Sequence, residues 1–139
     1  MKSIQPISTI MSSKIITLQK DDELETAELL FKKHKIRHIP VVENEAIIGM
    51  LSYTDLLRIS FADAVDETEM EIESLVYNMF TIEQVMAKNV ITVPSDASIK
   101  HVALILAQKE FHALPIVDDG RLVGIVTTTD LINYLLKQL

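Results

Sequence analysis

The stretch GMLSYTD at Gly49–Asp55 returns 75 residues later as GIVTTTD at Gly124–Asp130. Around this pair, residues 10–57 align with residues 85–132 without a gap, and 11 of the 48 aligned pairs are identical. Unrelated stretches of ordinary composition would share about three. Most of the remaining pairs exchange one apolar residue for another. The chain is therefore an internal duplication, and we expect its fold to be built from two similar halves.

Each half shows the same order of predicted elements, β-α-β-β-α. A β-branched run predicts a first strand at 15–18 and, in the second half, at 90–93. Polar residues that follow these strands are the candidate N-caps of a helix: Asp21, Asp22, Ser95 and Asp96. The apolar stripe expected on the first of these helices comprises Leu24, Ala27, Phe31 and His34. Its counterpart at 99–109 is apolar nearly all round, which indicates cover on more than one side and contact with a partner chain.

A hairpin and a last helix complete each half. The hairpin strands are expected at 39–42 and 47–51 in the first half, and at 114–117 and 122–126 in the second. Asp119-Gly120 is the stronger turn signal because glycine accepts the positive φ of a type I′ turn, and Asn44-Glu45 is a weaker version. A half of about 60 residues is too small to be comfortably stable alone. We therefore expect an α+β fold in which the halves pack face to face around a pseudo-twofold axis.

The composition excludes several classes of protein. The chain has 139 residues, no cysteine, and a formal net charge of −7 from 13 basic and 20 acidic residues. Without cysteine, a disulfide scaffold, a thiol nucleophile and Cys-ligated zinc or iron–sulfur centres are excluded. The longest apolar run, residues 102–107, is far too short to span a bilayer, and the N-terminus lacks the apolar core of a secretion signal. We expect a soluble cytoplasmic protein.

Acidic residues are concentrated between the two halves. Six of them lie within residues 61–80, which contain no Lys or Arg, and the rest of the chain is nearly neutral. A basic face, which nucleic-acid binding requires, is therefore not expected. Thr68–Glu71 has the form of a capping box, and an apolar helical stripe follows it. We expect an acidic helical linker at 61–77 between a first repeat at 4–60 and a second at 78–139.

The end of the repeated motif has two interpretations. Ser52–Asp55 and Thr127–Asp130 each have the S/T-x-x-D spacing of a capping box, which would simply begin the last helix. A helix start with free N–H groups, hydroxyls and a carboxylate is also suited to a ribose phosphate. Glu would serve about as well as Asp in a cap, and the cap gives no role to Thr54 and Thr129. The spacing alone leaves both interpretations open.

A basic residue precedes the proline-led strand in each half. The first half has Arg37-His38 and the second has His112. Either these residues are a polar connector between helix and strand, or they bind phosphate, for which the planar fork of Arg is best suited. Thr17 and Thr92, expected in the first strands, are weak indicators by themselves because Thr is an ordinary strand residue.

Together these features resemble a tandem pair of cystathionine β-synthase (CBS) domains. The resemblance rests on three patterns present in both halves, h-h-T-h, R/H-x-h-P-h-V and G-h-h-S/T-x-T-D, where h is apolar. It covers residues 4–60 and 78–139. It implies a stand-alone module with two clefts between the repeats that binds AMP, ADP or ATP, or else S-adenosylmethionine or a dinucleotide. It also implies that two modules stack as a disc-like homodimer.

The resemblance assigns a role to each repeated position. Asp55 and Asp130 match the family's ribose-binding Asp. The hydroxyls around ribose and phosphate correspond to Ser52, Thr54, Thr127 and Thr129. The basic phosphate-contacting positions correspond to Arg37, His38 and His112. Adenine would insert beside the first strands and the proline-led strands, at Thr17, Ile39, Pro40, Thr92, Leu114 and Pro115. Because Ala113 stands where the first repeat has His38, the second repeat has one basic side chain fewer for di- and triphosphates.

An enzyme is not expected, because the chain has neither a G-x-S-x-G nor a P-loop motif and has only three glycines. We expect no metal site and no cofactor, only an adenosine nucleotide with or without Mg²⁺. The expected function is regulatory: ligand binding modulates self-association or a protein target, without nucleic acid or membrane. The alternative is a nucleotide-free scaffold of CBS type that dimerises and docks a partner, which the apolar helix at 99–109 and the acidic linker favour.

Overall fold

The computed structural model describes residues 5–63, 79–109 and 111–139, which belong to two compact units. The first-repeat unit comprises Ile16–Val90, and the second-repeat unit comprises Ile91–Leu139 with the N-terminal segment Met1–Ile15. The capping box predicted at Thr68–Glu71 and most of the acidic linker lie outside the described residues. None of the helices in the described ranges is long and apolar enough to cross a membrane.

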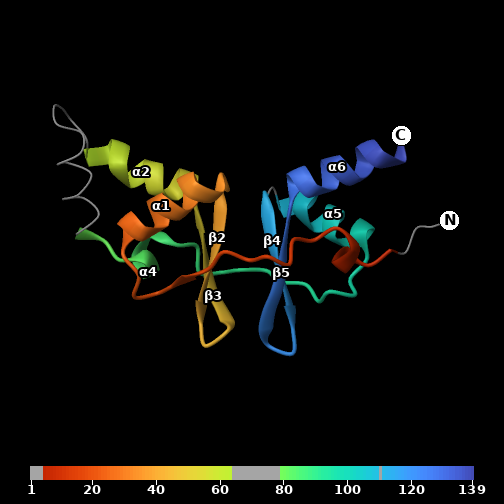
Figure 1. Ribbon diagram of the computed structural model, residues 1–139, viewed down its shortest axis with the longest axis horizontal. Helices are drawn as coiled ribbons and strands as arrows, with labels where there is room; N and C mark the ends of the chain where they lie inside the picture. The colour runs from red at the N-terminus through yellow and green to blue at the C-terminus, as the bar shows by residue number, and fades with distance from the viewer. Residues whose placement is uncertain (1–4, 64–78, 110) are drawn as a thin grey trace. The chain divides into compact units, whose positions relative to one another are not determined.

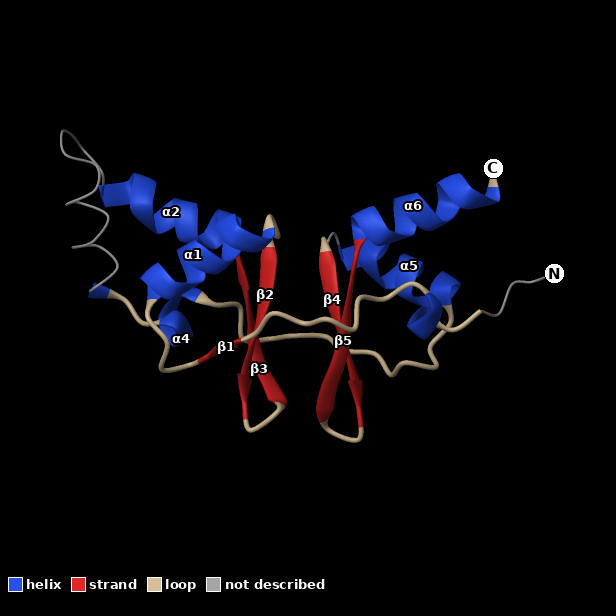
Figure 2. Ribbon diagram, in the orientation of Figure 1, coloured by secondary structure: helices blue, strands red, loops and turns tan. Residues whose placement is uncertain are grey.

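The first-repeat unit combines a three-stranded sheet with helices (Figure 2). Its elements are β1 (Leu18–Gln19), α1 (Leu24–His34), β2 (His38–Glu43), β3 (Ala46–Ser52), α2 (Tyr53–Asp63) and α4 (Ile82–Val85). The strand order is β1-β2-β3, with β1 parallel and β3 antiparallel to β2. α1 and α2 pack together near one end of the β2–β3 hairpin (Figure 1). The β-α-β-β-α order predicted for the first half is confirmed.

The second-repeat unit repeats this plan with a reduced first strand. Its elements are the 3₁₀ turn η1 (Ile7–Thr9), α5 (Ile99–Lys109), β4 (Ala113–Asp118), β5 (Arg121–Thr127) and α6 (Thr128–Gln138). β4 and β5 form an antiparallel hairpin. In place of β1, Val93 alone bridges Ile116 in parallel. The N–H of Val93 donates to the carbonyl of Pro115 at 3.3 Å, and that of Val117 donates to the carbonyl of Val93 at 2.9 Å.

The two hairpin turns have the backbone that the sequence predicts. Asp119 and Gly120 have φ values of 50° and 77°, so both lie in the left-handed region that a type I′ turn requires. Asn44 and Glu45 have φ values of 53° and 72°, which is the same geometry without a glycine. Asn adopts this region readily, whereas Glu does so at a conformational cost.

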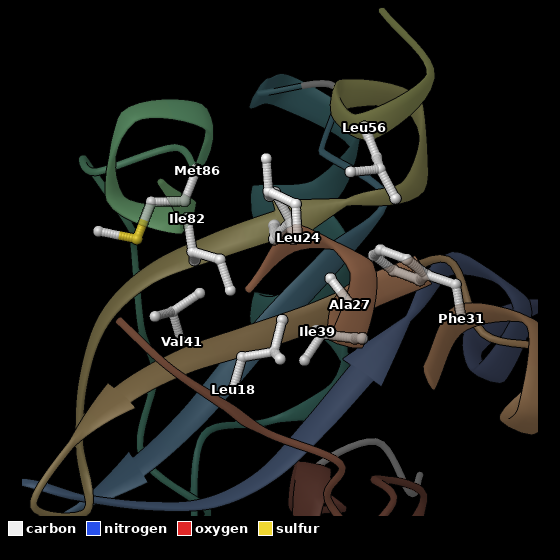
Figure 3. Close-up of a cluster of buried hydrophobic side chains, with 10 residues drawn as sticks. Leu18, Leu24, Ala27, Phe31, Ile39, Val41, Leu56, Ile82 and Met86 are labelled. Atoms are coloured by element: carbon white, nitrogen blue, oxygen red, sulfur yellow. The ribbon is translucent and has the colours of Figure 1, made fainter. Parts of the chain in front are cut away.

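Each unit has its own apolar core. In the first-repeat unit the buried residues are Leu18, Leu24, Ala27, Phe31, Ile39, Val41, Leu51, Leu56, Ile82 and Met86. Figure 3 shows side chains of α1 and of the strands pointing toward one another, with Ile82 and Met86 beside them. In the second-repeat unit they are Ile7, Val93, Ile99, Val102, Leu106, Leu114, Ile116 and Val126. The predicted stripe on α1 is confirmed at three positions, but His34 is exposed.

The units exchange their N-terminal segments relative to the sequence repeats. Met50 and Ala87 exchange backbone hydrogen bonds of 3.0 and 2.9 Å, which attach the start of the second repeat to β3. Ser12 and Ile125 do the same at 2.8 and 3.0 Å, which attaches the start of the chain to β5. The compact units therefore differ from the sequence repeats. The repeat boundaries at 4–60, 61–77 and 78–139 stay a prediction.

Some local predictions are wrong for reasons that the hydrogen bonds explain. Asp22 does not cap α1: its carboxylate accepts from the N–H of Gln19 at 2.8 Å, and the N-cap is Glu23, without a side-chain bond. Ser98 takes the capping role predicted for Ser95, because its hydroxyl accepts from the N–H of His101 at 3.0 Å. The predicted first strands at 15–18 and 90–93 are also too long, since strand pairing begins only at Leu18 and at Val93.

Candidate functional site

The hairpin register brings the basic residues to the start of the last helix in each unit. The carbonyl of Arg37 accepts from the N–H of Tyr53 at 2.8 Å, and β2 residue His38 pairs with Ser52. In the second-repeat unit the carbonyl of His112 accepts from the N–H of Thr128 at 3.0 Å. Sequence positions 14 to 16 residues apart thus meet at one place in each unit. We call the group Arg37, His38, Ser52, Thr54 and Asp55 the α2 site, and the group His112, Thr127, Thr129 and Asp130 the α6 site.

Both helix starts are capping boxes, as one of the two interpretations predicts. At the α6 site the N–H of Asp130 donates to the Thr127 hydroxyl at 3.1 Å, and the Asp130 carboxylate Oδ2 accepts from the Thr127 N–H at 2.9 Å. At the α2 site the same pair of bonds joins Ser52 and Asp55 at 3.0 and 3.3 Å. Of the two carboxylate oxygens each cap uses only Oδ2, so the cap does not exclude a ligand on Oδ1.

The hydroxyl of each middle Thr takes no part in its cap. Thr54 and Thr129 are exposed in the first turns of α2 and α6. The N–H groups on either side of Thr54 already have acceptors: that of Tyr53 donates to the Arg37 carbonyl and that of Asp55 to the Ser52 hydroxyl. The N–H groups on either side of Thr129 are bonded in the same way. In the described part of the chain this leaves the N–H of Thr54, and likewise that of Thr129, open to an anion beside a hydroxyl.

The residues assigned to adenine lie along the neighbouring strand. Thr17 and Thr92 directly precede the bridging residues Leu18 and Val93. They therefore lie just before the first strand, whereas the sequence predicts them inside it. Thr17 is half-buried and Thr92 is exposed. The strand residues beside them are buried: Ile39, Pro40, Leu114 and Pro115. The contribution of these six residues to a ligand site stays a prediction.

One residue of the α2 site was missed by sequence reasoning. Arg58 Nη1 lies 3.1 Å from Asp55 Oδ1, the carboxylate oxygen that the cap does not use. The side chain of Arg58 is 69% exposed and that of Asp55 is 21% exposed. The i,i+3 spacing of an acid and a base on one helix was the signal that could have found it.

A sequence profile of the CBS domain matches the chain twice, at residues 7–62 and 82–137. Protein MJ1225 of Methanocaldococcus jannaschii is 30% identical over 132 residues, which are 94% of this chain and 43% of that protein. The chain thus spans less than half the length of this relative.

Two solved structures have similar folds. The CBS domain pair of protein MJ0100, in complex with 5′-methylthioadenosine and S-adenosylmethionine, has a TM-score of 0.80 at 28% identity and covers 98% of this chain and 99% of its own. CBSX2 in complex with AMP has a TM-score of 0.80 at 22% identity, with coverage of 96% and 97%. CBS domain pairs are generally regulatory rather than catalytic modules. With the profile matching both repeats, the chain belongs to the CBS domain family and carries a pair of CBS domains.

Proposed function

We propose that this chain is a regulatory module that binds AMP, ADP or ATP at the α2 and α6 sites. One arrangement, found in both units, supports the proposal. A carboxylate with one oxygen outside the cap, an exposed Thr hydroxyl, an open N–H and a basic residue gather at one helix start. The carboxylate oxygens of Asp55 and Asp130 accept from ribose hydroxyls, which are donors of matching geometry.

The remaining assignments follow the chemistry of each group. Thr54 and Thr129, with their N–H groups, donate to phosphate oxygens at the positive end of a helix. Arg37, His38 and His112 offset the phosphate charge. Ser52 and Thr127 hold the carboxylates in place through the caps. The adenine base lies beside the first two strands of each unit. The residues are Thr17, Ile39 and Pro40 in the first-repeat unit, and Thr92, Leu114 and Pro115 in the second.

Unfolding of the full chain with and without ligand tests the proposal. A ligand present at 100 times its Kd stabilises the folded state by about 2.7 kcal/mol. We expect such a gain with millimolar AMP or ATP, and its loss in the double variant Asp55→Asn, Asp130→Asn, which retains the side-chain size. If no adenosine ligand stabilises the wild-type chain, the proposed function is wrong.

A second variant separates phosphate recognition from ribose recognition. Arg37 is exposed, and within the described residues its guanidinium has no hydrogen-bond or ion-pair partner. Arg37→Ala is expected to weaken ATP binding, measured by calorimetry, by about 1.5–3 kcal/mol and to leave adenosine binding nearly unchanged. Equal losses for the two ligands would remove Arg37 from the phosphate role.

S-adenosylmethionine or a dinucleotide is an alternative ligand of the same sites. The MJ0100 pair, whose structure holds S-adenosylmethionine, favours it. A calorimetric comparison of S-adenosylmethionine with AMP decides between the two.

The proposal gives the chain no catalytic step and no cofactor, and Mg²⁺ enters only as the counter-ion of ATP. It places the module in the cytoplasm, where these ligands are abundant.

A nucleotide-free scaffold is the second candidate function, and one surface favours it. Four residues at helical spacing on α6 and its C-cap, which we call the α6 stripe, are 56–92% exposed: Ile132, Leu135, Leu136 and Leu139. Leu104 of α5, in the same unit, is 47% exposed. Exposed apolar stripes of this kind are characteristic of interaction surfaces. We propose that the stripe forms a homodimer, whether or not nucleotide is bound.

A further inference from the structure

The carboxylate oxygen that the cap leaves unused, Oδ1, has an ion-pair partner at the α2 site and none within the described residues at the α6 site. Asp55 Oδ1 forms an ion pair with Arg58 Nη1 at 3.1 Å. The position of Arg58 is taken in the second repeat by Asn133. Within the described residues, no hydrogen bond or ion pair uses Oδ1 of Asp130. A ribose hydroxyl can therefore donate directly to Asp130, whereas at Asp55 it must compete with a guanidinium.

The competition makes the α2 site a poorer site for an uncharged nucleoside. An exposed ion pair changes an equilibrium by up to about fivefold, which is the disadvantage that Arg58 imposes. For a ligand that carries a negative charge this loss of affinity is compensated, because the guanidinium of Arg58, once released from Asp55, can bind the anion. Arg58 therefore acts against neutral ligands and not against phosphorylated ones.

The cations around the two sites differ in the same direction. Lys33, Lys35 and Arg37 are exposed at the end of α1 and in the connection to β2, and none of them forms an ion pair within the described residues. Their described counterparts in the second repeat include Gln108 and His112, an amide and an imidazole. The guanidinium fork of Arg37 binds two phosphate oxygens at once, which an imidazole does not.

From these two observations we infer that the sites divide ligands by charge. The α2 site favours phosphorylated adenosine, and the α6 site, which also binds it, favours uncharged adenosine derivatives. This inference rests on the proposed function, because it presupposes that both sites bind an adenosine ligand, and it adds which chemical class each one favours. Arg58 is the residue that sets the difference at ribose, and Arg37 sets it at phosphate.

Amide NMR titrations of the full chain test the inference one site at a time. The N–H groups of Thr54 and Asp55 report on the α2 site, and those of Thr129 and Asp130 on the α6 site. With AMP, we expect the α2 reporters to saturate at lower concentration than the α6 reporters. With 5′-methylthioadenosine, which has no phosphate, we expect the opposite order. The same order for both ligands overturns the inference but leaves the proposed function standing, whereas no response to either ligand overturns the proposed function itself.

Exchanging the residues at the Arg58 position isolates its contribution. Arg58→Asn is expected to raise the affinity of the α2 site for 5′-methylthioadenosine by about two- to fivefold, with no gain for AMP. Asn133→Arg should lower the affinity of the α6 site for 5′-methylthioadenosine by a similar factor. Lys88→Asn is the matched control: it removes one exposed positive charge that forms no ion pair with Asp55, and should change neither affinity. Unchanged or weaker 5′-methylthioadenosine binding in Arg58→Asn overturns the role of Arg58.

Discussion

Ser95 and Lys20 hold corresponding positions in the two repeats, and each attaches the chain after the first strand to the end of the next strand. The Ser95 hydroxyl donates to Asp118 Oδ2 at 2.6 Å, and the Ser95 N–H donates to Oδ1 at 2.9 Å. In the first repeat, Lys20 Nζ lies 3.1 Å from Glu43 Oε2. One fold position is thus secured by two hydrogen bonds in one unit and by an ion pair in the other. These bonds favour the charged form of the Asp118 carboxyl and so lower its pKa. The bond from the Ser95 hydroxyl contributes most, and the bond from the Ser95 N–H contributes next.

This shift predicts a dependence of stability on pH. A carboxyl whose pKa is lower in the folded state stabilises the fold above its unfolded pKa, and the gain is lost as the pH falls through the folded value. Wild-type protein should therefore lose more unfolding free energy than Asp118→Asn between about pH 5 and pH 3, a window that contains the ordinary Asp pKa near 3.9. Urea unfolding across this range measures the difference.

The matched control for this prediction is Asp96→Asn. Asp96 is an exposed neighbour with no ion pair among the described residues. Its variant should follow the wild-type profile. A wild-type profile parallel to that of Asp118→Asn would show that the Ser95 bonds do not contribute.

Gly49 and Gly124 illustrate a glycine required for space rather than for its backbone angle. A Cβ on Gly49 would collide with the Met86 side chain, whose Cγ would lie 2.9 Å away. On Gly124 it would meet Met11, with Cγ and Cε both at 3.1 Å. Each methionine belongs to the exchanged N-terminal segment, so the repeated glycines are the places where these segments lie against the hairpins.

We predict that Gly49→Ala destabilises the protein by about 1–3 kcal/mol, the usual cost of overpacking. Equilibrium urea unfolding measures the loss. In a Met86→Ala background the same substitution should cost clearly less, because the colliding side chain is gone. Equal costs in the two backgrounds would contradict the steric explanation.

At the scale of elements, the two hairpin turns share one geometry but not one sequence. Gly120 has a φ of +77° and open space around its Cβ position, so a substitution there meets only a backbone penalty. Gly120→Ala is expected to cost about 1 kcal/mol of unfolding free energy. Gly120→Asn should cost less, since Asn enters the left-handed region more readily. Chemical unfolding of the two variants compares them, and a larger loss for Asn would contradict this account.

The elements could be predicted from sequence wherever the signal was local. Apolar periodicity placed α1 and its buried face, and Asp119-Gly120 placed a type I′ turn. The exchange of N-terminal segments could not be predicted, because it depends on which distant hairpin Met11 and Met86 meet, and neither residue carries a local signal for that. Several caps could not be predicted because Ser, Asp and Asn serve caps and turns equally well.

The candidate site was predictable in its members but not in its internal bonds. The repeat picked out the Thr-Asp pairs and the basic residues, and strand register brings them together in each unit. One difference between the sites is a single substitution, Arg58 in the first repeat for Asn133 in the second, and the repeat alignment does not distinguish it from ordinary surface variation. Residues identical in both repeats indicate a function that the two sites have in common, and differences next to them indicate different ligand preferences.

For the whole molecule, the exposed stripe of α6 predicts self-association. Ile132, Leu135, Leu136 and Leu139 follow the i, i+3, i+4, i+7 spacing of one helical face, and leaving all four in water is unfavourable by about 25 cal/mol for each Å² of apolar surface. A second copy presenting the same stripe would cover it by an isologous contact, the commonest arrangement in homo-oligomers. We therefore expect a dimer of the wild-type chain in sedimentation analysis at micromolar concentration.

A charge on the stripe should separate the two copies without unfolding either. Leu135 is 56% exposed, so Leu135→Glu removes little from the core but places two carboxylates in a C2-related contact, where burial and repulsion both oppose association. We expect this variant to sediment as a monomer while its thermal unfolding stays cooperative. Asn133→Glu, with the same added charge on an exposed position of α6 outside the stripe, should remain dimeric. If AMP binds the monomeric Leu135→Glu variant as tightly as the dimer, ligand binding and assembly are independent. A weaker affinity would show that nucleotide favours the assembled form, and the difference would equal the coupling free energy between the two.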